Sequence, residues 1–257
     1  MTDPSLPHAL ERRLRIRARR ELVFRYFTDS DRWAAWWGEG STIDPRPGGA
    51  VVIRYPNAVE AAGQVLEIEP PRRLVFTYGY VSGEPIAPGA SRVTIELADD
   101  PAGTRLELRH EFAAAPVRDS HVQGWRYQLA VFANTVADAT HAGVDATVDA
   151  WFAAWSEPGA GRRAEILAAA VAPGIRFRDR FSAVDGLEDL EPHLAAVHAF
   201  MPGQTLVRDG DARHCQGTAL ADWRAIGADG LERGRGTNVF TLDADGRIED
   251  VVGLWNR

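Results

Sequence analysis

Lysine is absent from this sequence, and cysteine is nearly so. All 29 basic residues of the 257-residue chain are arginines, and Cys215 is the only cysteine. Without a lysine amine there is no Schiff-base aldolase, no pyridoxal-phosphate enzyme and no P-loop of the GK[ST] type. One cysteine excludes an internal disulfide, a CxxC redox pair and a cysteine zinc finger. The GxSxG and HExxH signatures of two common hydrolase classes are also missing.

Long apolar runs are missing as well. No stretch approaches the length that spans a membrane, and the N-terminus lacks the apolar core of a signal peptide. We therefore expect a cytoplasmic protein with no membrane partner. The apolar fraction is 45% and the charged fraction 25%, values that are ordinary for one large or two small globular domains.

The net charge of −7 is concentrated in the second half of the chain. Residues 1–143 hold 17 arginines and 18 acids, whereas residues 144–257 hold 12 and 18. One dense basic run, between Arg12 and Arg20, fits a nucleic-acid patch or the solvent face of an alternating strand. Because the half around it is almost neutral, we favour the strand and expect no nucleic-acid partner.

Apolar alternation and turn signals predict an antiparallel sheet in the first half. The predicted order is one strand, two short helices, five strands (50–55, 63–69, 73–80, 92–98 and 104–112) and a helix over 120–139. The long helix carries an apolar stripe that includes Trp125, Leu129 and Phe132. An open sheet must bury one face, so we expect this helix to cover it.

The second half begins after a short linker at residues 141–143, where we place the boundary between domains 1–143 and 144–257. Helices are predicted over 145–155, 162–171 and 187–200, with strands over 175–179, 205–209, 216–226, 231–242 and 247–255. Helices followed by a curling antiparallel meander are typical of an α+β domain with a cone-shaped interior.

The stretches VFRYFTDSDRWAAWWGEG (23–40), GQVLEIEPPRRLVFTY (63–78) and HVQGWRYQLAVFANTV (121–136) carry a family resemblance. In their order and spacing the first half resembles the SRPBCC superfamily, which has the START-like helix-grip fold. The most similar branch is named after the activator of the heat-shock-protein-ninety ATPase. The resemblance implies a hydrophobic cavity under the C-terminal helix. It implies no single activity, because members include lipid and hormone binders and polyketide aromatases and cyclases.

The stretches VDAWFAAW (148–155), DGLEDLEPHLAAVHAFMPG (185–203) and GRGTNVFTLDADGRIEDVVGLW (234–255) carry a second resemblance. The second half resembles the SnoaL-like branch of the nuclear-transport-factor-two-like superfamily, to which polyketide cyclases and ketosteroid isomerase belong. The resemblance implies a cone whose mouth accepts a small ligand and a sheet through which the protein dimerises. We therefore expect a homodimer.

Asp179 is the sharpest candidate for a catalytic group. It shares the inward face of a predicted strand with Ile175 and Phe177, where desolvation raises the pKa of a carboxyl group and suits it to act as a base. The resemblance places it where isomerase-like members carry their base. The alternative is a structural carboxylate at the strand end, paired with Arg178, Arg180 or Arg213.

Asn238 is the second catalytic candidate, because its parity with Phe240 and Leu242 turns it inward. Isomerase-like members hold an acid at this place that donates a hydrogen bond to a developing oxyanion, and an Asn amide can donate too. The alternative is a buried Asn tied to the backbone. Trp151 occupies the place of a donor Tyr in those members, a departure that weakens a true isomerase mechanism.

His198 is the third catalytic candidate, since a histidine can exchange a proton near neutral pH, and His214 is a possible ligand contact. For each of these two histidines the alternative is a structural role, which we favour. The remaining histidines and acids make no cluster with ligand spacing, so we predict no metal and no other cofactor.

Aromatic residues are the expected walls of the two cavities. The alternative for all of them is packing in the hydrophobic core. The residues predicted to contact a ligand are Trp151, Trp155, Trp223 and His214 in the second half and Trp36, Phe76, Tyr78 and Trp125 in the first.

Together these features predict two α+β domains that handle a small hydrophobic molecule. The leading hypothesis is acid/base chemistry in the second domain, a cyclisation or isomerisation with Asp179 as base. The alternatives are a non-catalytic carrier or sensor with two cavities and a stress-related interaction module. A cone filled by Trp151, Trp155 and Trp223 would exclude the enzyme.

Overall fold

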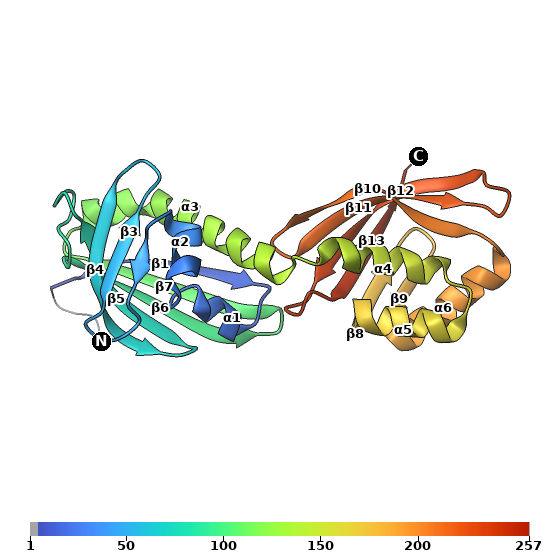
Figure 1. The fold of residues 1–257 in the computed structure, drawn as a ribbon, viewed down its shortest axis with the longest axis horizontal. Helices are drawn as coiled ribbons and strands as arrows, with labels where there is room; N and C mark the ends of the chain where they lie inside the picture. The colour runs from blue at the N-terminus through green and yellow to red at the C-terminus, as the bar shows by residue number, and fades with distance from the viewer. Residues whose placement is uncertain (1–4, 257) are drawn as a thin grey trace. The chain divides into compact units, whose positions relative to one another are not determined.

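The computed structural model describes residues 5–256 and divides the chain into two compact units (Figure 1). Unit 1 is Met1–Ala137 and unit 2 is Asp138–Arg257. Each combines one sheet with helices, so the predicted α+β class with two domains is confirmed. The division falls within the last turn of a long helix, slightly before the linker at which the sequence placed it.

The sheet of unit 1 has seven strands, and every pair of neighbours is antiparallel. Their order across the sheet is β1-β7-β6-β5-β4-β3-β2. The strands are β1 (His8–Ile16), β2 (Thr42–Ile43), β3 (Ala50–Arg54), β4 (Glu60–Glu69), β5 (Arg73–Tyr80), β6 (Ser91–Asp100) and β7 (Gly103–Phe112). Only β2, a two-residue strand without periodicity, was absent from the prediction.

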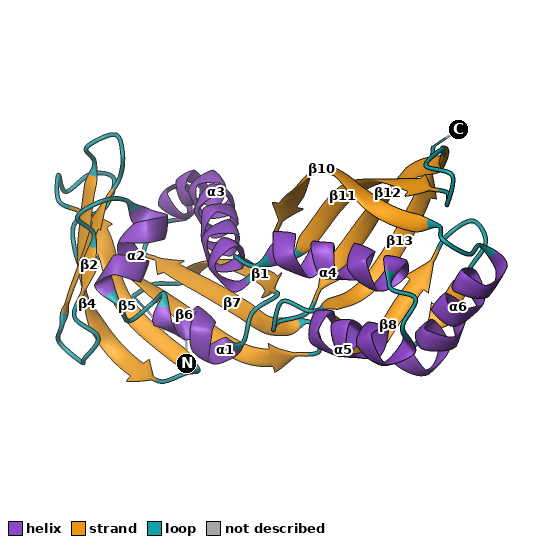
Figure 2. Cartoon of the chain, turned by 45° about the vertical axis from the view of Figure 1, so that its right-hand side comes forward, coloured by secondary structure: helices purple, strands orange, loops and turns teal. Residues whose placement is uncertain are grey.

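Three helices accompany this sheet: α1 (Arg20–Arg25), α2 (Ser30–Trp37) and α3 (Ala115–Thr140). Helix α2 begins after Asp29, whose side chain accepts the backbone N–H of Arg32 at 3.1 Å and so caps the first turn. Helix α3 lies along one face of the sheet (Figure 2). Its buried stripe, with Trp125 and Phe132, joins the same hydrophobic core as the inward side chains of the strands, as predicted.

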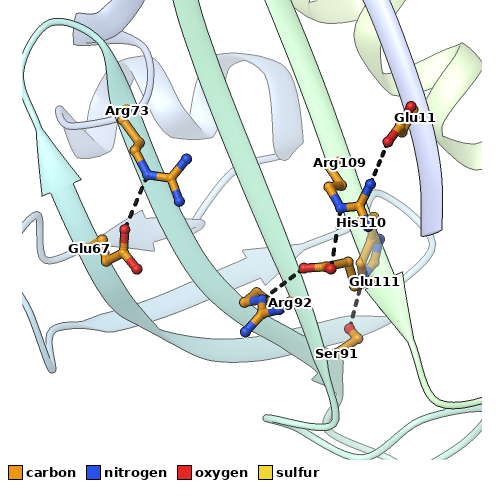
Figure 3. A network of polar contacts seen from close by, with 8 residues as sticks. All are labelled: Glu11, Glu67, Arg73, Ser91, Arg92, Arg109, His110 and Glu111. Atoms are coloured by element: carbon orange, nitrogen blue, oxygen red, sulfur yellow. Dashed lines mark hydrogen bonds and ion pairs between the residues drawn. The ribbon is translucent and has the colours of Figure 1, made fainter. Parts of the chain in front are cut away.

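The arginine-rich strand β1 pairs with β7 at one edge of the sheet, where Arg13 lies opposite Glu107 and Glu11 opposite Arg109. Arg15 lies opposite Arg105 and pairs with Asp100 at 3.0 Å. The strand ends at Ile16, so the basic run continues beyond it. On the same face, Glu111 is buried between Arg92, at 2.8 Å, and Arg109, at 3.2 Å (Figure 3). Ion pairs across neighbouring strands therefore cover this face of unit 1.

Unit 2 has a six-stranded sheet in the order β10-β11-β12-β13-β8-β9, in which only β13 and β8 are parallel. Its strands are β8 (Val171–Arg178), β9 (Ala183–Asp185), β10 (Thr205–Cys215), β11 (Thr218–Ile226), β12 (Glu232–Leu242) and β13 (Ile248–Trp255). Its helices are α4 (Val144–Ser156), α5 (Ala160–Ala170) and α6 (Leu187–Phe200). The helices pack their buried residues against the sheet in one core. Among the described residues, no helix combines the length and apolarity needed to cross a membrane.

The turn between β10 and β11 corrects the sequence-based boundaries. Residues 216–217 form the turn, with Gln216 at φ 49° and Gly217 at φ 81°. His214 therefore lies next to the last residue of β10, which ends at Cys215. The strand runs six residues further than predicted, and a register shift between Asp209 and Arg213 hides the alternation of this extension.

The pairing of Glu111 gives unit 1 a stability that depends on pH. The two arginines hold the pKa of this carboxyl group below its ordinary value, although burial opposes them. The folded chain therefore takes up this proton at lower pH than the unfolded chain. The stabilisation that the Glu111 ion pairs give to the fold is complete above the ordinary Glu pKa of about 4.3. It is lost as the pH falls through the lower pKa that Glu111 has in the folded chain.

We therefore expect Glu111→Gln to be less stable than the parent at neutral pH, with the difference shrinking below about pH 4.3. The measurement is urea unfolding of both proteins at a series of pH values. Glu39→Gln, at an exposed position, is the control and should show no such trend. A difference that stays constant across the series would contradict the role of the arginines.

Candidate functional site

Unit 2 contains a pocket of about 470 Å³ between its sheet and its helices α4 and α6. Its walls are mainly apolar and aromatic, with a few polar groups, the composition of small-molecule sites. Trp155 and Trp223 line it without filling it, so the condition that would have excluded an enzyme is not met. Asp179 and Asn238, the two leading candidates, both lie in its wall.

Asp179 directly follows β8 and is half-buried. One carboxylate oxygen, Oδ1, accepts the backbone N–H of Phe181 at 2.8 Å, and Oδ2 accepts the indole N–H of Trp255 at 3.0 Å. The arginine pairing considered as an alternative does not occur among the described contacts: Arg178 bonds Asp250 at 2.9 Å and Arg213 pairs with Asp222. The carboxylate is therefore held by two neutral donors.

Asn238 lies on β12 and is 4% exposed. Its Oδ1 accepts the indole N–H of Trp223 at 3.0 Å, so the side chain is tied to another side chain and not to the backbone. Because an indole can only donate, this bond fixes which end of the amide is oxygen. Among the described contacts, no protein group accepts from the amide nitrogen of Asn238, which leaves an N–H donor for a ligand.

Gly253 on β13 separates the two candidates. A Cβ atom at this position would lie 2.9 Å from the Cβ of Asp179 and 3.3 Å from Oδ1 of Asn238. Asn238 is the partner of Gly253 in the sheet register, and β8 runs along the other side of β13. The missing side chain therefore lets a carboxylate and an amide approach each other across a strand.

Two tryptophans, Trp223 and Trp255, fix Asn238 and Asp179 through their indole N–H groups. The rings of Trp223 and Trp255 pack edge to face, with centroids 4.9 Å apart. Glycines leave room for them, since a Cβ at Gly236 would lie 2.5 Å from Trp223 and one at Gly234 2.9 Å from Trp255. Trp255 was missed as a site residue, although its alternation with Gly253 and Val251 places it on the inward face of β13.

The pocket histidine is His193, so the prediction of His198 is wrong in position. His193, Val197 and Met201 follow each other at intervals of four and line the pocket, whereas His198 lies about 100° further round α6. Nε2 of His193 is 3.2 Å from the Ser182 hydroxyl, and its ring lies beside Trp155. Burial, with Arg163 nearby, lowers the pKa of His198.

Two predicted ligand contacts of unit 2 lie outside the pocket. Trp151 is fully enclosed and packs against Phe177 and Phe240 in the core. Nε2 of His214 accepts the backbone N–H of Gly217 at 3.0 Å, and burial lowers the pKa of this ring. Both side chains support the fold, the alternative that the sequence left open.

Unit 1 has a cavity of about 530 Å³, formed by α2, α3 and strand β5. Trp36, Tyr78 and Trp125, three of the predicted ligand contacts, lie in its wall. Phe76 does not: it is 1% exposed and packs edge to face against Trp33 in the core. The prediction of Phe76 as a ligand contact is therefore wrong, because its partners on that face are core aromatics.

A buried hydrogen-bond chain supports the floor of this cavity. The indole N–H of Trp125 donates to Nδ1 of His110 at 2.9 Å, so the proton of the imidazole is on Nε2. Nε2–H then donates to the Ser91 hydroxyl at 2.8 Å (Figure 3), which donates to the carbonyl of Tyr78 at 2.8 Å. Burial keeps the pKa of His110 well below its ordinary value, so the ring stays neutral.

A metal site is not apparent in the part of the chain that the structure describes. There, no group of three or more His, Cys, Asp or Glu side chains is arranged to hold an ion.

One family model matches part of the chain. Residues 17–137 match the model of the family described as activator of Hsp90 ATPase homolog 1-like protein, which agrees with the resemblance of the first half. No curated protein matches the chain.

Solved structures show local likeness at modest scores. A protein from Agrobacterium tumefaciens described as a candidate isomerase of the SnoaL-like family is 28% identical, covering 46% of this chain and 99% of its own, with a TM-score of 0.42. CalU16 from Micromonospora echinospora is 27% identical, covering 51% and 76%, with a TM-score of 0.40. A Chromobacterium violaceum protein is 26% identical, covering 49% and 96%, with a TM-score of 0.41.

Asp179 and Asn238 lie so close to the backbone of Gly253 that a side chain at this position should destabilise unit 2. In Gly253→Ala the new methyl group must displace Asp179 or Asn238, and we expect a loss of about 1–3 kcal/mol in the free energy of unfolding, measured by urea denaturation. Gly174→Ala, also in unit 2, has no atom within 4 Å of the added methyl and is the matched control. Equal stability of the two variants would show that the gap between the candidates is not sterically required.

Proposed function

We propose that unit 2 binds a small, mainly apolar carbonyl compound and moves a proton on it, as in an isomerisation or cyclisation. The observation that supports this most is the placement of one carboxylate and one unpaired amide N–H on either side of Gly253, in the wall of an apolar pocket. A base and an oxyanion donor on the same side of a bound molecule are what such chemistry needs.

In the proposed reaction Asp179 takes a proton from the carbon next to the carbonyl group. The electron pair of that C–H bond moves onto the carbonyl oxygen through an enolate, and the Asn238 N–H donates a hydrogen bond to this oxygen as its negative charge grows. Asp179 then returns the proton to another carbon, or the enolate carbon attacks a second carbonyl group, whose oxygen becomes an alkoxide and takes the proton back from Asp179. The proton balance closes within the pocket.

The bonds that hold Asp179 are compatible with a base. Each carboxylate oxygen has two lone pairs and uses one of them for Phe181 or Trp255, so a lone pair remains on each for the substrate. The two donors fix the carboxylate plane before the substrate arrives, which is the preorganised arrangement that catalysis favours.

For unit 1 we propose binding without chemistry, which keeps the carrier function as the second candidate. Among the described residues that line its cavity there is no Asp, Glu or Arg, and burial lowers the pKa of its histidine, His121. Its lining is rich in Trp and Tyr side chains, which suit the retention of a flat apolar molecule.

The proposed base can be tested by hydrogen exchange. Purified protein is first examined by native mass spectrometry for a co-purified small molecule, and that molecule or a cyclic β,γ-unsaturated ketone is then incubated with the protein in deuterium oxide. We expect deuterium at the carbon next to the carbonyl with the parent protein and a loss of at least about 100-fold in its rate with Asp179→Asn, at unchanged binding.

Asp185→Asn, an exposed carboxylate on the neighbouring strand β9, is the matched control and should exchange at the parent rate. Exchange by Asp179→Asn at the parent rate would contradict the role of Asp179. Binding by the parent without any exchange would favour the carrier.

A further inference from the structure

Gln128 on helix α3 is a buried polar residue in the wall of the unit 1 cavity. Only 6% of its surface is exposed, and it lies beside the apolar stripe of the helix, next to Leu129. An amide group in such surroundings is costly unless its polar atoms find partners. The periodicity of the sequence did not single out this residue, so its hydrogen bonds are a finding of the structure.

One end of the Gln128 amide is fixed by the backbone of helix α2. Its nitrogen, Nε2, donates a hydrogen bond to the carbonyl oxygen of Trp36. Because a carbonyl oxygen can only accept, the amide must present its nitrogen to Trp36 and its oxygen, Oε1, to the other side. The orientation of the amide therefore does not depend on a tautomer or on the rotation of a hydroxyl group.

The oxygen of this amide is open to the cavity. Oε1 of Gln128 accepts no hydrogen bond among the described contacts. Each enclosed side-chain nitrogen or oxygen that lacks a partner in the described part of the chain belongs to another residue, so Oε1 is reachable from the space that Gln128 lines. A buried side chain thus turns a fixed acceptor towards whatever occupies the cavity.

The tryptophans of this cavity offer no indole donor to a ligand. The N–H of Trp36 donates to the carbonyl of Tyr26 at 3.2 Å, and that of Trp125 donates to His110 at 2.9 Å. The indole nitrogen of Trp37 is enclosed. What the three rings present is flat apolar surface: the centroids of Trp36 and Trp37 are 4.3 Å apart, and Trp37 packs edge to face against Trp125. Such walls suit a flat aromatic molecule.

Gly124 leaves the approach to Gln128 clear. It lies one turn before Gln128 on α3, lines the cavity and is exposed. A Cβ at this position would have no atom within 4 Å, so a longer side chain would project into open space at the mouth. A glycine inside a helix costs about 0.8–1.0 kcal/mol relative to alanine, and here it keeps the mouth wide.

We infer that the unit 1 cavity selects a neutral, flat aromatic molecule that carries an N–H or O–H donor, and that Oε1 of Gln128 accepts this hydrogen bond. No Asp, Glu or Arg is among the described lining residues, so a charged ligand would find no partner of opposite charge there. A ligand with an acceptor in place of the donor would leave Oε1 unpaired. The inference rests on the proposed binding role of unit 1 and is independent of the chemistry proposed for unit 2.

Indole and benzofuran test the inference, because the two molecules have nearly the same shape. Indole presents an N–H that can only donate, where benzofuran has an oxygen that can only accept. The full chain is titrated with each molecule by isothermal titration calorimetry. We expect indole to bind about tenfold more tightly than benzofuran, the effect of one additional hydrogen bond in a buried site.

Gln128→Met removes the acceptor and keeps the length of the side chain. It should reduce the affinity for indole to that for benzofuran and leave the binding of benzofuran unchanged. Gln123→Met, at an exposed position of the same helix outside the cavity, is the matched control and should keep the preference for indole. Circular dichroism confirms that each variant folds, and the ratio of affinities in the parent is measured without any variant.

Gly124→Leu assigns the binding to this cavity. The new side chain stands at the mouth, and we expect the binding of both probes to be lost. Because leucine favours a helix more than glycine does, the variant should be at least as stable as the parent, so the loss cannot be attributed to unfolding. Unchanged binding of both probes by Gly124→Leu would place them outside this cavity and overturn the inference.

The remaining outcomes separate the inference from the function beneath it. Equal affinities for indole and benzofuran in the parent, or a preference for indole that survives Gln128→Met, would overturn the inference, while the binding of both probes leaves the cavity a binding site. Failure of both probes to bind the parent would overturn the inference together with the binding role of unit 1.

Discussion

A buried indole N–H can only donate, and this one-way requirement fixes the polar groups of both cavities. Trp125 donates to His110, Trp223 to Asn238 and Trp255 to Asp179. Each bond fixes one property of its acceptor. In His110 the nitrogen Nδ1 must be unprotonated, in Asn238 the oxygen of the amide must face the indole, and in Asp179 one carboxylate oxygen is occupied. Leaving such a donor without a partner in the core would cost about 1–3 kcal/mol, so these bonds are coupled to folding.

The requirement is not met everywhere. Among the described contacts Trp37, Trp151 and Trp155 have buried indole nitrogens without an acceptor. All three lie in or beside a cavity: Trp37 and Trp155 line one, and Trp151 packs against Trp155. Both units therefore combine polar groups that are fixed by an indole hydrogen bond with tryptophans whose own indole N–H has no acceptor among the described contacts.

The sequence was sufficient for the fold and for two of the polar groups of the unit 2 pocket. The long strands and the buried stripe of α3 could be predicted from the spacing of their apolar residues. The two-residue alternation of the strands also predicted that Asp179 and Asn238 face inward. Strands β2 and β9 have two and three residues and carry no period to detect. His198 was predicted because a histidine can exchange a proton near neutral pH, whereas the pocket is lined by every fourth residue from His193.

Other parts of the site depend on distances that no periodicity contains. The approach of Asp179 to Asn238 is set by the missing side chain at Gly253 on a third strand, and the bond from Trp255 joins residues 76 positions apart. The hydrogen bond between the hydroxyls of Tyr55 and Tyr78 joins a residue just beyond the end of β3 to one on β5, across the intervening strand β4. Long-range packing decides such contacts, and only the folded chain displays them.

Two neighbouring histidines of unit 1, His110 and His121, illustrate how a fixed hydrogen-bond partner selects the tautomer of an imidazole ring. The imidazoles of His110 and His121 are 5.4 Å apart, yet they are opposite tautomers, with the proton on Nε2 in the first and on Nδ1 in the second. Nitrogen NMR distinguishes these forms, so the pair provides two separate spectroscopic reporters within one cavity. A molecule that displaces the Tyr80 hydroxyl changes the signal of His121. His110, enclosed by Trp125 and Ser91, records whether the floor of the cavity has moved.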